Sequence, residues 1–90
     1  MVRQIVPVNP ANADPERAAR WKEQRRRLGL RVRGLRLEAG LTQEALALAS
    51  GWSRNQIIYV ENGVRGTLVE RLCDLADALG VEVGDLLKSE

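Results

Sequence analysis

The residues best suited to chemistry lie in one short stretch, SRNQIIYV at residues 53–60. Arginine pairs well with guanine O6 and N7, asparagine pairs with adenine N6 and N7, and isoleucine can contact a thymine methyl group. In a helix, Ile57 and Val60 lie on one side and would anchor the segment to a core. The other side gathers four residues within an arc of about 140°: Arg54, Asn55, Ile58 and Tyr59. The stretch therefore predicts a short helix with a core face and an outward face.

The chain lacks the residue types on which most catalytic and metal sites depend. It has no histidine and one cysteine, Cys73, which excludes a disulfide within the chain and a zinc site of the Cys/His type. No serine or cysteine has a histidine to activate it, and Asp74 and Asp77 are expected to lie on a solvated helix face. Cys73 is predicted to be buried among neighbouring leucines. We expect a protein that is not an enzyme and that uses no cofactor or metal.

The charge is distributed unevenly along the 90 residues. Residues 1–36 contain ten basic and three acidic residues, whereas residues 37–90 contain four basic and nine acidic residues. Such an asymmetry favours an anionic partner for one part of the molecule. Solvated helix faces of differing sign would give the same pattern, so both interpretations stay open.

Length and apolar content indicate one small domain with an aliphatic core. No apolar run approaches the ~20 residues of a membrane-spanning helix. The N-terminus, MVRQIVPVNP, lacks the long apolar stretch of a secretory signal. We expect a cytoplasmic protein without a membrane partner.

Apolar periodicity and capping residues predict an all-α chain of five short helices after a basic N-terminal extension. The first helix has Leu28, Val32 and Leu35 as its core stripe and ends at Gly40. The next three begin at residues whose side chains are expected to cap them: Thr42, Ser53 with Gln56, and Thr67 with Glu70. A last short helix is expected within residues 81–87.

The N-terminal extension, residues 1–27, is separated in this prediction from a domain at residues 28–88. Prolines argue against a helix in residues 1–13, which would form a flexible arm or a short extended piece. Asp14 and Pro15 then favour a helix start, and this helix either ends or runs into the next one near Leu28.

Two features of the extension have competing interpretations. The run Arg25-Arg26-Arg27 either steers DNA, as basic residues that neutralise phosphates do, or forms a solvated helix face. Trp21, alone among basic residues, is expected to anchor the extension by packing rather than to stack on a base.

The segment between residues 47 and 60 has the spacing of a helix-turn-helix. Ala47 is small enough for two helices to approach, and Gly51 supplies a turn conformation that other residues resist. Ile57 and Val60 follow at the offsets expected for the core face of the second helix.

Residues 28–87 resemble the Cro/repressor-type (Xre-like) helix-turn-helix family, in order and without gaps. The matching segments are LGLRVRGLR, AGLTQEALA, SGWSRNQI, VENGVR and LADALGV. The chain departs from the family at Ala45, where glutamate is frequent, and at Gly66-Thr67, where proline is common. The resemblance implies a five-helix Cro/repressor-like bundle, to which this chain adds a basic N-terminal arm or helix.

The resemblance also implies roles for individual residues, with the helix after Ser53 entering the DNA major groove. It places base contacts at Arg54, Asn55, Ile58 and Tyr59. It places contacts with backbone phosphates at Gln43, Ser53, Asn62 and Arg65. It matches Arg36 and Glu61 to a structural ion pair. Two alternatives stay open, since Ile58 could serve a protein contact and Tyr59 could pack against the fold.

The function implied is that of a sequence-specific transcriptional regulator, a repressor, which binds double-stranded DNA and is therefore expected to be nucleoid-associated. A unit this small reads few base pairs, so a homodimer on a pseudo-palindromic operator is expected. Candidate interface residues are Val83, Leu86 and Leu87, and three leucines off the core stripe would receive the N-terminal helix or a second subunit: Leu30, Leu37 and Leu48. The alternatives are an antitoxin that binds a toxin through residues 1–27, and a protein-binding adaptor that does not bind DNA.

Overall fold

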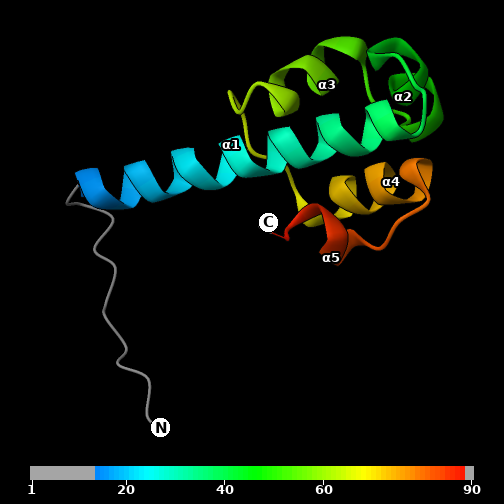
Figure 1. The fold of residues 1–90 in the computed structure, drawn as a ribbon. Helices are drawn as coiled ribbons and strands as arrows, with labels where there is room; N and C mark the ends of the chain where they lie inside the picture. The colour runs from blue at the N-terminus through cyan, green and yellow to red at the C-terminus, as the bar shows by residue number, and fades with distance from the viewer. Residues whose placement is uncertain (1–13, 89–90) are drawn as a thin grey trace, which may run out of the picture.

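The structure, a computed structural model, describes residues 14–88, which form five helices and no strand. The helices are α1 (Pro15–Glu38), α2 (Gln43–Ser50), α3 (Arg54–Glu61), α4 (Val69–Leu79) and α5 (Val83–Leu86). In Figure 1, α3 lies along one side of α1, and α4 and α5 lie along the other. The all-α, five-helix prediction is confirmed, and the arm expected at residues 1–13 lies outside the described residues. None of the described helices combines the length and apolarity that a membrane crossing requires.

Helix α1 joins two expected helices into one. It begins as predicted, because Asp14 accepts a hydrogen bond from the Glu16 backbone N–H at 2.9 Å and Pro15 occupies the first turn. The helix then continues through Leu28 to Glu38 without a break. The boundary expected between residues 27 and 28 falls inside this helix, whose N-terminal half projects beyond the other helices (Figure 1).

The core lies where α1, the α2–α3 pair and the α4–α5 pair meet. Its largest fully buried side chains come one from each helix: Val32, Leu46, Ile57, Leu75 and Leu86. Leu28 and Leu35 pack half-buried against this cluster, as the core stripe predicts. The expectation that Leu86 contributes to a subunit interface is wrong because its side chain is 0% exposed, whereas Leu87 is exposed.

Side-chain caps begin α2 and α3 as predicted. Thr42 Oγ1 accepts a hydrogen bond from the Ala45 N–H at 3.0 Å. Ser53 Oγ accepts from the Gln56 N–H at 3.1 Å, and Gln56 Oε1 accepts from the Ser53 N–H at 2.8 Å. Each cap satisfies backbone donors that lack a partner within the helix. The sequence therefore defines where both helices of the helix-turn-helix begin.

Two predictions about α4 are wrong. Thr67 and Glu70 form no capping box, because the helix cap is Leu68 and no side chain caps α4. Cys73 is exposed rather than buried. It follows Leu72 by about 100° around the helix, which turns it away from the core stripe. That stripe consists of Leu72, Leu75 and Ala76.

Several apolar side chains remain on the surface. Leu30 and Leu37 are both more than half exposed, and Leu48 is 82% exposed. The N-terminal helix cannot pack on Leu30 or Leu37, as one prediction held, because it continues the same helix axis. Trp21 is not a packing anchor either, since it is 53% exposed and the Arg17 guanidinium lies 4.6 Å from its ring centroid.

Candidate nucleic-acid interface

The turn between α2 and α3 sets the position of α3. Gly51 has a φ of 76°, in the left-handed region that glycine adopts without strain. Ala47 is buried, and Trp52 packs into the core while its Nε1 donates to the Arg71 carbonyl oxygen at 3.2 Å. The turn and its tryptophan therefore connect α3 both to α2 and to α4. This arrangement confirms the helix-turn-helix predicted from the spacing.

Helix α3 has two distinct faces. Ile57 and Val60 are 0% and 3% exposed and lie in the core, as predicted. Arg54 and Asn55 are exposed, and within residues 14–88 their side chains form no hydrogen bond or ion pair. Ile58 is half-buried. The outward face thus carries polar groups that are free to meet a ligand, and their contact with DNA stays a prediction.

Tyr59 is held at the flank of that face by Arg65. The Arg65 guanidinium lies 4.6 Å from the tyrosine ring centroid, a distance at which a cation is attracted to the ring face. Both residues line a cleft of about 190 Å³ between α3 and the start of α4, with Gln56 and Thr67. Tyr59 is therefore oriented by the loop after α3, a link that the sequence analysis missed.

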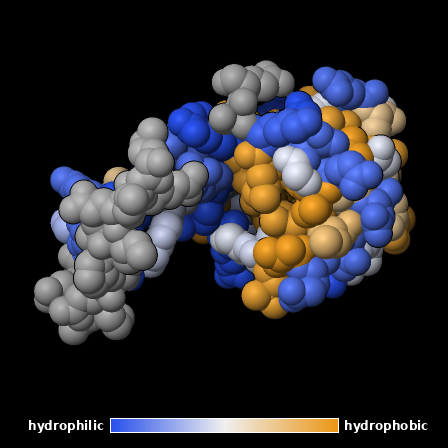
Figure 2. Space-filling view, turned by 90° about the horizontal axis from the view of Figure 1, so that it is seen from below, coloured by the Kyte–Doolittle hydropathy of each residue, from blue (hydrophilic) through white to orange (hydrophobic). Residues whose placement is uncertain are grey.

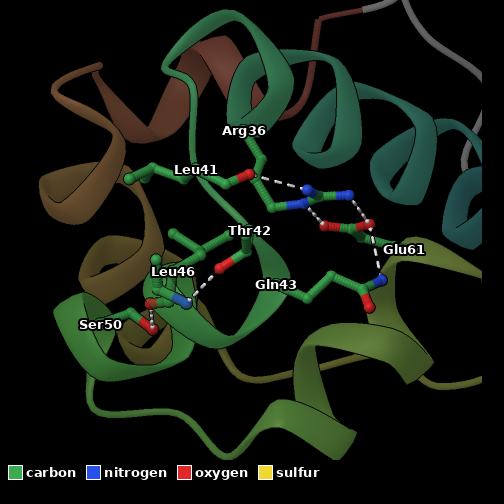
Figure 3. A network of polar contacts seen from close by, with 8 residues as sticks. Arg36, Leu41, Thr42, Gln43, Leu46, Ser50 and Glu61 are labelled. Atoms are coloured by element: carbon green, nitrogen blue, oxygen red, sulfur yellow. Dashed lines mark hydrogen bonds and ion pairs between the residues drawn. The ribbon is translucent and has the colours of Figure 1, made fainter.

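A buried ionic network joins α1, α2 and α3 (Figure 3). Arg36 Nε donates to Glu61 Oε2 at 2.6 Å, and Arg36 Nη2 donates to Glu61 Oε1 at 3.0 Å. Arg36 Nη1 donates to the Leu41 carbonyl oxygen, and Gln43 Nε2 donates to Glu61 Oε1 at 3.2 Å. Both charged side chains are buried. The network places the start of α2 beside the end of α3 and occupies one N–H of the Gln43 amide.

Gly29 allows the end of α3 to lie directly against α1. A methyl group at this glycine would clash with the Val60 and Glu61 carbonyl groups, at 2.8 Å from the Glu61 carbonyl carbon. Gly29 was predicted only as part of a junction between helices. A glycine inside a helical pattern is the available signal for such a close approach.

The loop after α3 lies against α1 as well. Arg25 Nε donates to the Gly63 carbonyl oxygen at 3.3 Å, and a Cβ atom on Gly63 would be 3.1 Å from Arg26 Cα. This loop contains Asn62, which is exposed at the end of α3, and Arg65. The loop residues expected to contact phosphates are therefore next to the basic half of α1.

The residues expected to contact phosphates flank the outward face of α3 at both of its ends. Ser53 caps its N-terminus, where Ser53 Oγ is already used as an acceptor. Gln43 lies near the C-terminal end of α3, because it donates to Glu61, the last residue of that helix. Asn62 follows at the same end. The four base-facing candidates lie between these groups along one short helix.

A second charged cluster lies on α1, away from α3. Glu23 Oε1 is 2.7 Å from Arg26 Nη2 and 3.2 Å from Arg27 Nε, and all three side chains are exposed. The hydrogen bond from Arg26, together with Arg27, lowers the pKa of Glu23 to about 2. Two of the three arginines in the run Arg25-Arg26-Arg27 are therefore paired with a carboxylate. The described residues contain no group of three or more acidic, cysteine or histidine side chains able to hold a metal.

Comparison with known proteins finds a family model, a relative and solved structures that each match more than half of this chain. A model of the helix-turn-helix family matches residues 32–86. Over 65 residues the chain is 38% identical to the uncharacterized HTH-type transcriptional regulator y4dJ of Sinorhizobium fredii. That match covers 72% of this chain and 84% of the relative.

Solved structures with the same fold are also regulators by name. The restriction-modification controller protein C.AhdI from Aeromonas hydrophila is 37% identical, with a TM-score of 0.70, over 72% of this chain and 94% of that protein. The clp gene regulator ClgR from Corynebacterium glutamicum is 34% identical, with a TM-score of 0.67, over 71% of this chain and 83% of that protein. In all of these matches, part of this chain has no counterpart.

Proposed function

The chain belongs to the Cro/repressor-type (Xre-like) helix-turn-helix family of transcriptional regulators. From this premise we propose that it is a repressor that reads a pseudo-palindromic operator as a homodimer. The observation that carries the proposal is the outward face of α3, where Arg54 and Asn55 are exposed and unengaged within the described residues. The core contacts of Ile57 and Val60 hold this face rigidly. A rigid helix with free base-reading groups suits insertion into the major groove.

Base reading is assigned to Arg54 and Asn55 first. Arginine suits guanine, asparagine suits adenine, and a good bidentate pair contributes about 1–3 kcal/mol of discrimination. Ile58 follows one turn after Arg54 and would meet a thymine methyl group. Tyr59, bound to Arg65 at the flank of α3, would lie at the groove edge.

Phosphate contacts position the helix at its two ends. Gln43 keeps one amide N–H that is not bonded to Glu61, and it begins α2, where backbone N–H groups favour an anion. Asn62 and Arg65 follow α3 and can reach the same backbone from the other end. Ser53 would contribute through its hydroxyl proton, because Ser53 Oγ only accepts in the helix cap and the Ser53 backbone N–H already donates to Gln56 Oε1.

Dimerisation is assigned to the face that carries α4 and α5. Figure 2 shows apolar side chains gathered on this face. Leu87 is 63% exposed there, and Val83 is half-buried. Two subunits related by a two-fold axis would present their α3 helices about 34 Å apart, one turn of DNA. C.AhdI is a restriction-modification controller and ClgR is a clp gene regulator, so the operator of this chain must be measured.

Selection of binding sites from random duplex DNA tests the proposal. The wild-type chain is expected to enrich a pseudo-palindrome, and Arg54→Ala with Asn55→Ala is expected to lose or blur it. Arg20→Ala serves as a control, because it also removes an exposed positive charge but lies on α1, about 140° around the helix from Arg25 and its contact with the loop after α3. No enrichment by the wild type at low salt, or equal enrichment by the α3 variant, would overturn the proposal.

A further inference from the structure

The N-terminal half of α1, residues 15–27, is a feature that the family domain does not include; we name it the α1 extension. The helix-turn-helix match begins at residue 32, and Figure 1 shows the extension projecting past the other helices. It has six basic and two acidic residues, and none of its residues is buried. Because the extension is helical but not buried, its charged side chains are accessible to a partner.

The side of α1 that faces α3 is defined by contacts. Arg25 donates to Gly63, Gly29 lies against the end of α3, and Arg36 binds Glu61. These positions are separated by four and seven residues, which places them on one side of the helix. Five further residues of the extension fall within about 80° of the direction of Arg25: Pro15, Arg17, Ala18, Trp21 and Lys22.

Both carboxylates of the extension lie on the opposite side. Glu16 and Glu23 are within about 20° of the direction directly away from Arg25. Glu23 there binds Arg26 and Arg27, so these arginines are partly neutralised. Within residues 15–27, the side facing α3 has three cations and no carboxylate. The Asp14 carboxylate lies just beyond its end and accepts the helix cap. Its only large apolar group is Trp21, which is exposed and covered in part by Arg17.

This cationic side begins next to the loop that is assigned to phosphate contacts. Arg25 is bonded to Gly63, and Gly63 lies between Asn62 and Arg65 in sequence. A DNA strand held by that loop would continue toward the α1 extension. The eleven residues of helix from Pro15 to Arg25 span about 15 Å, enough to follow several phosphates.

We propose that Arg17, Lys22 and Arg25, with Trp21, form a second DNA-binding surface that holds the sugar–phosphate backbone beside the major groove read by α3. This inference rests on the proposed function. The surface adds affinity without base preference, because it contacts the backbone alone. It gives the chain a wider footprint than that of the helix-turn-helix.

Salt dependence of binding tests this surface with two charge-matched variants. The first changes Arg17, Lys22 and Arg25 to Gln, and the second changes Arg20, Arg26 and Arg27 to Gln on the other side. Glutamine favours helix, so both variants should keep α1, which circular dichroism checks. Kd is measured against KCl concentration, with an operator duplex obtained by selection and a random-sequence duplex of equal length.

The first variant is expected to reduce the slope of log Kd against log salt by about 2–3 per bound subunit, since each phosphate contact contributes about 0.9. The other reductions are also counted per bound subunit. The reduction should be equal for both duplexes, while their affinity ratio stays constant. The second variant should reduce it by about 1 or less. A double variant, Arg17→Gln with Lys22→Gln, leaves the Arg25–Gly63 contact intact and should still lower the slope by nearly 2.

Hydroxyl-radical footprinting locates the contact, because protection outside the operator half-site should disappear in the first variant. Equal slopes for the wild type and all variants, or equal losses in both triple variants, would overturn this inference while leaving the proposed function in place. Failure of the wild type to bind either duplex at low salt would overturn both.

Discussion

The two halves of α1 share one helix but are stabilised in different ways. Residues 28–38 contain Gly29, Val32 and Arg36, all buried against other helices. Residues 15–27 contain no buried residue, and their helix depends on the Asp14 cap, Pro15 and contacts between side chains. The C-terminal half therefore determines where α3 lies, whereas the N-terminal half is a charged surface.

The ion pairs in the two halves of α1 also differ in burial. Arg36–Glu61 and Arg26–Glu23 have similar separations, 2.6 and 2.7 Å. The side chains of the first pair are 9% and 2% exposed, and those of the second are 58% and 41% exposed. Burial, not distance, decides what each pair contributes, because water and salt screen the exposed one.

Breaking the buried pair should have the largest effect. Glu61→Gln leaves the Arg36 guanidinium buried without a counter-charge, and the free energy of unfolding should fall by about 3–5 kcal/mol. Urea denaturation measures this change. The double variant Arg36→Met with Glu61→Leu should be more stable than Glu61→Gln, because no unpaired charge is buried. A loss below about 1 kcal/mol for Glu61→Gln would show that this pair does not organise the fold.

Two glycines of α1 allow the next largest effect to be measured with a matched control. Gly29→Ala should lower stability by about 1–3 kcal/mol, because the added methyl group must displace the backbone at the end of α3. Gly34→Ala, five residues later, has no atom within 4 Å of the added methyl group. It should raise stability by up to about 1 kcal/mol through helix propensity.

Thermal unfolding of both variants shows whether helix propensity or packing against α3 determines the effect of an added methyl group at each position of α1. A destabilised Gly34→Ala would contradict the open surface at this position and would indicate that another subunit covers it. An unaffected Gly29→Ala would mean that α3 lies farther from α1 than the structure places it.

The exposed Arg26–Glu23 pair should have the smallest effect on stability, so the pKa of Glu23 is measured instead. The pKa of Glu23, about 2 instead of 4.5, lies below its ordinary value because Arg26 and Arg27 bind the carboxylate. A carboxyl group whose pKa is lowered by folding stabilises the folded protein at pH values above its ordinary pKa. For Glu23, that stabilisation disappears as the pH falls from about 4.5 to about 2. NMR titration of the Glu23 carboxyl group should give the low value in dilute salt and a higher one in 1 M KCl, a concentration that shortens the Debye length to about 3 Å. An ordinary pKa in dilute salt would mean that the pair does not persist in solution.

Local features of the chain could be predicted from the residues alone. The caps at Thr42 and Ser53, and the opposite faces of Ile57 and Asn55, follow from hydrogen-bonding groups and spacing within a few residues. The prediction for Cys73 failed because neighbours in sequence were taken as neighbours in space, although one step along a helix turns a side chain by about 100°. The prediction of the α4 cap failed because this helix has Leu68 rather than Thr67 at its N-cap, and leucine has no side-chain group that could cap it.

The sequence by itself determined the helical class, the helix-turn-helix spacing and the side chains that α3 presents. Those properties depend on short-range periodicity and on residue chemistry. The tertiary structure alone decided that Gly29 lies under α3, that Arg65 holds Tyr59 and that the basic extension begins beside the loop after α3. These contacts join residues six to 38 positions apart, and only the packing of the core brings such residues together.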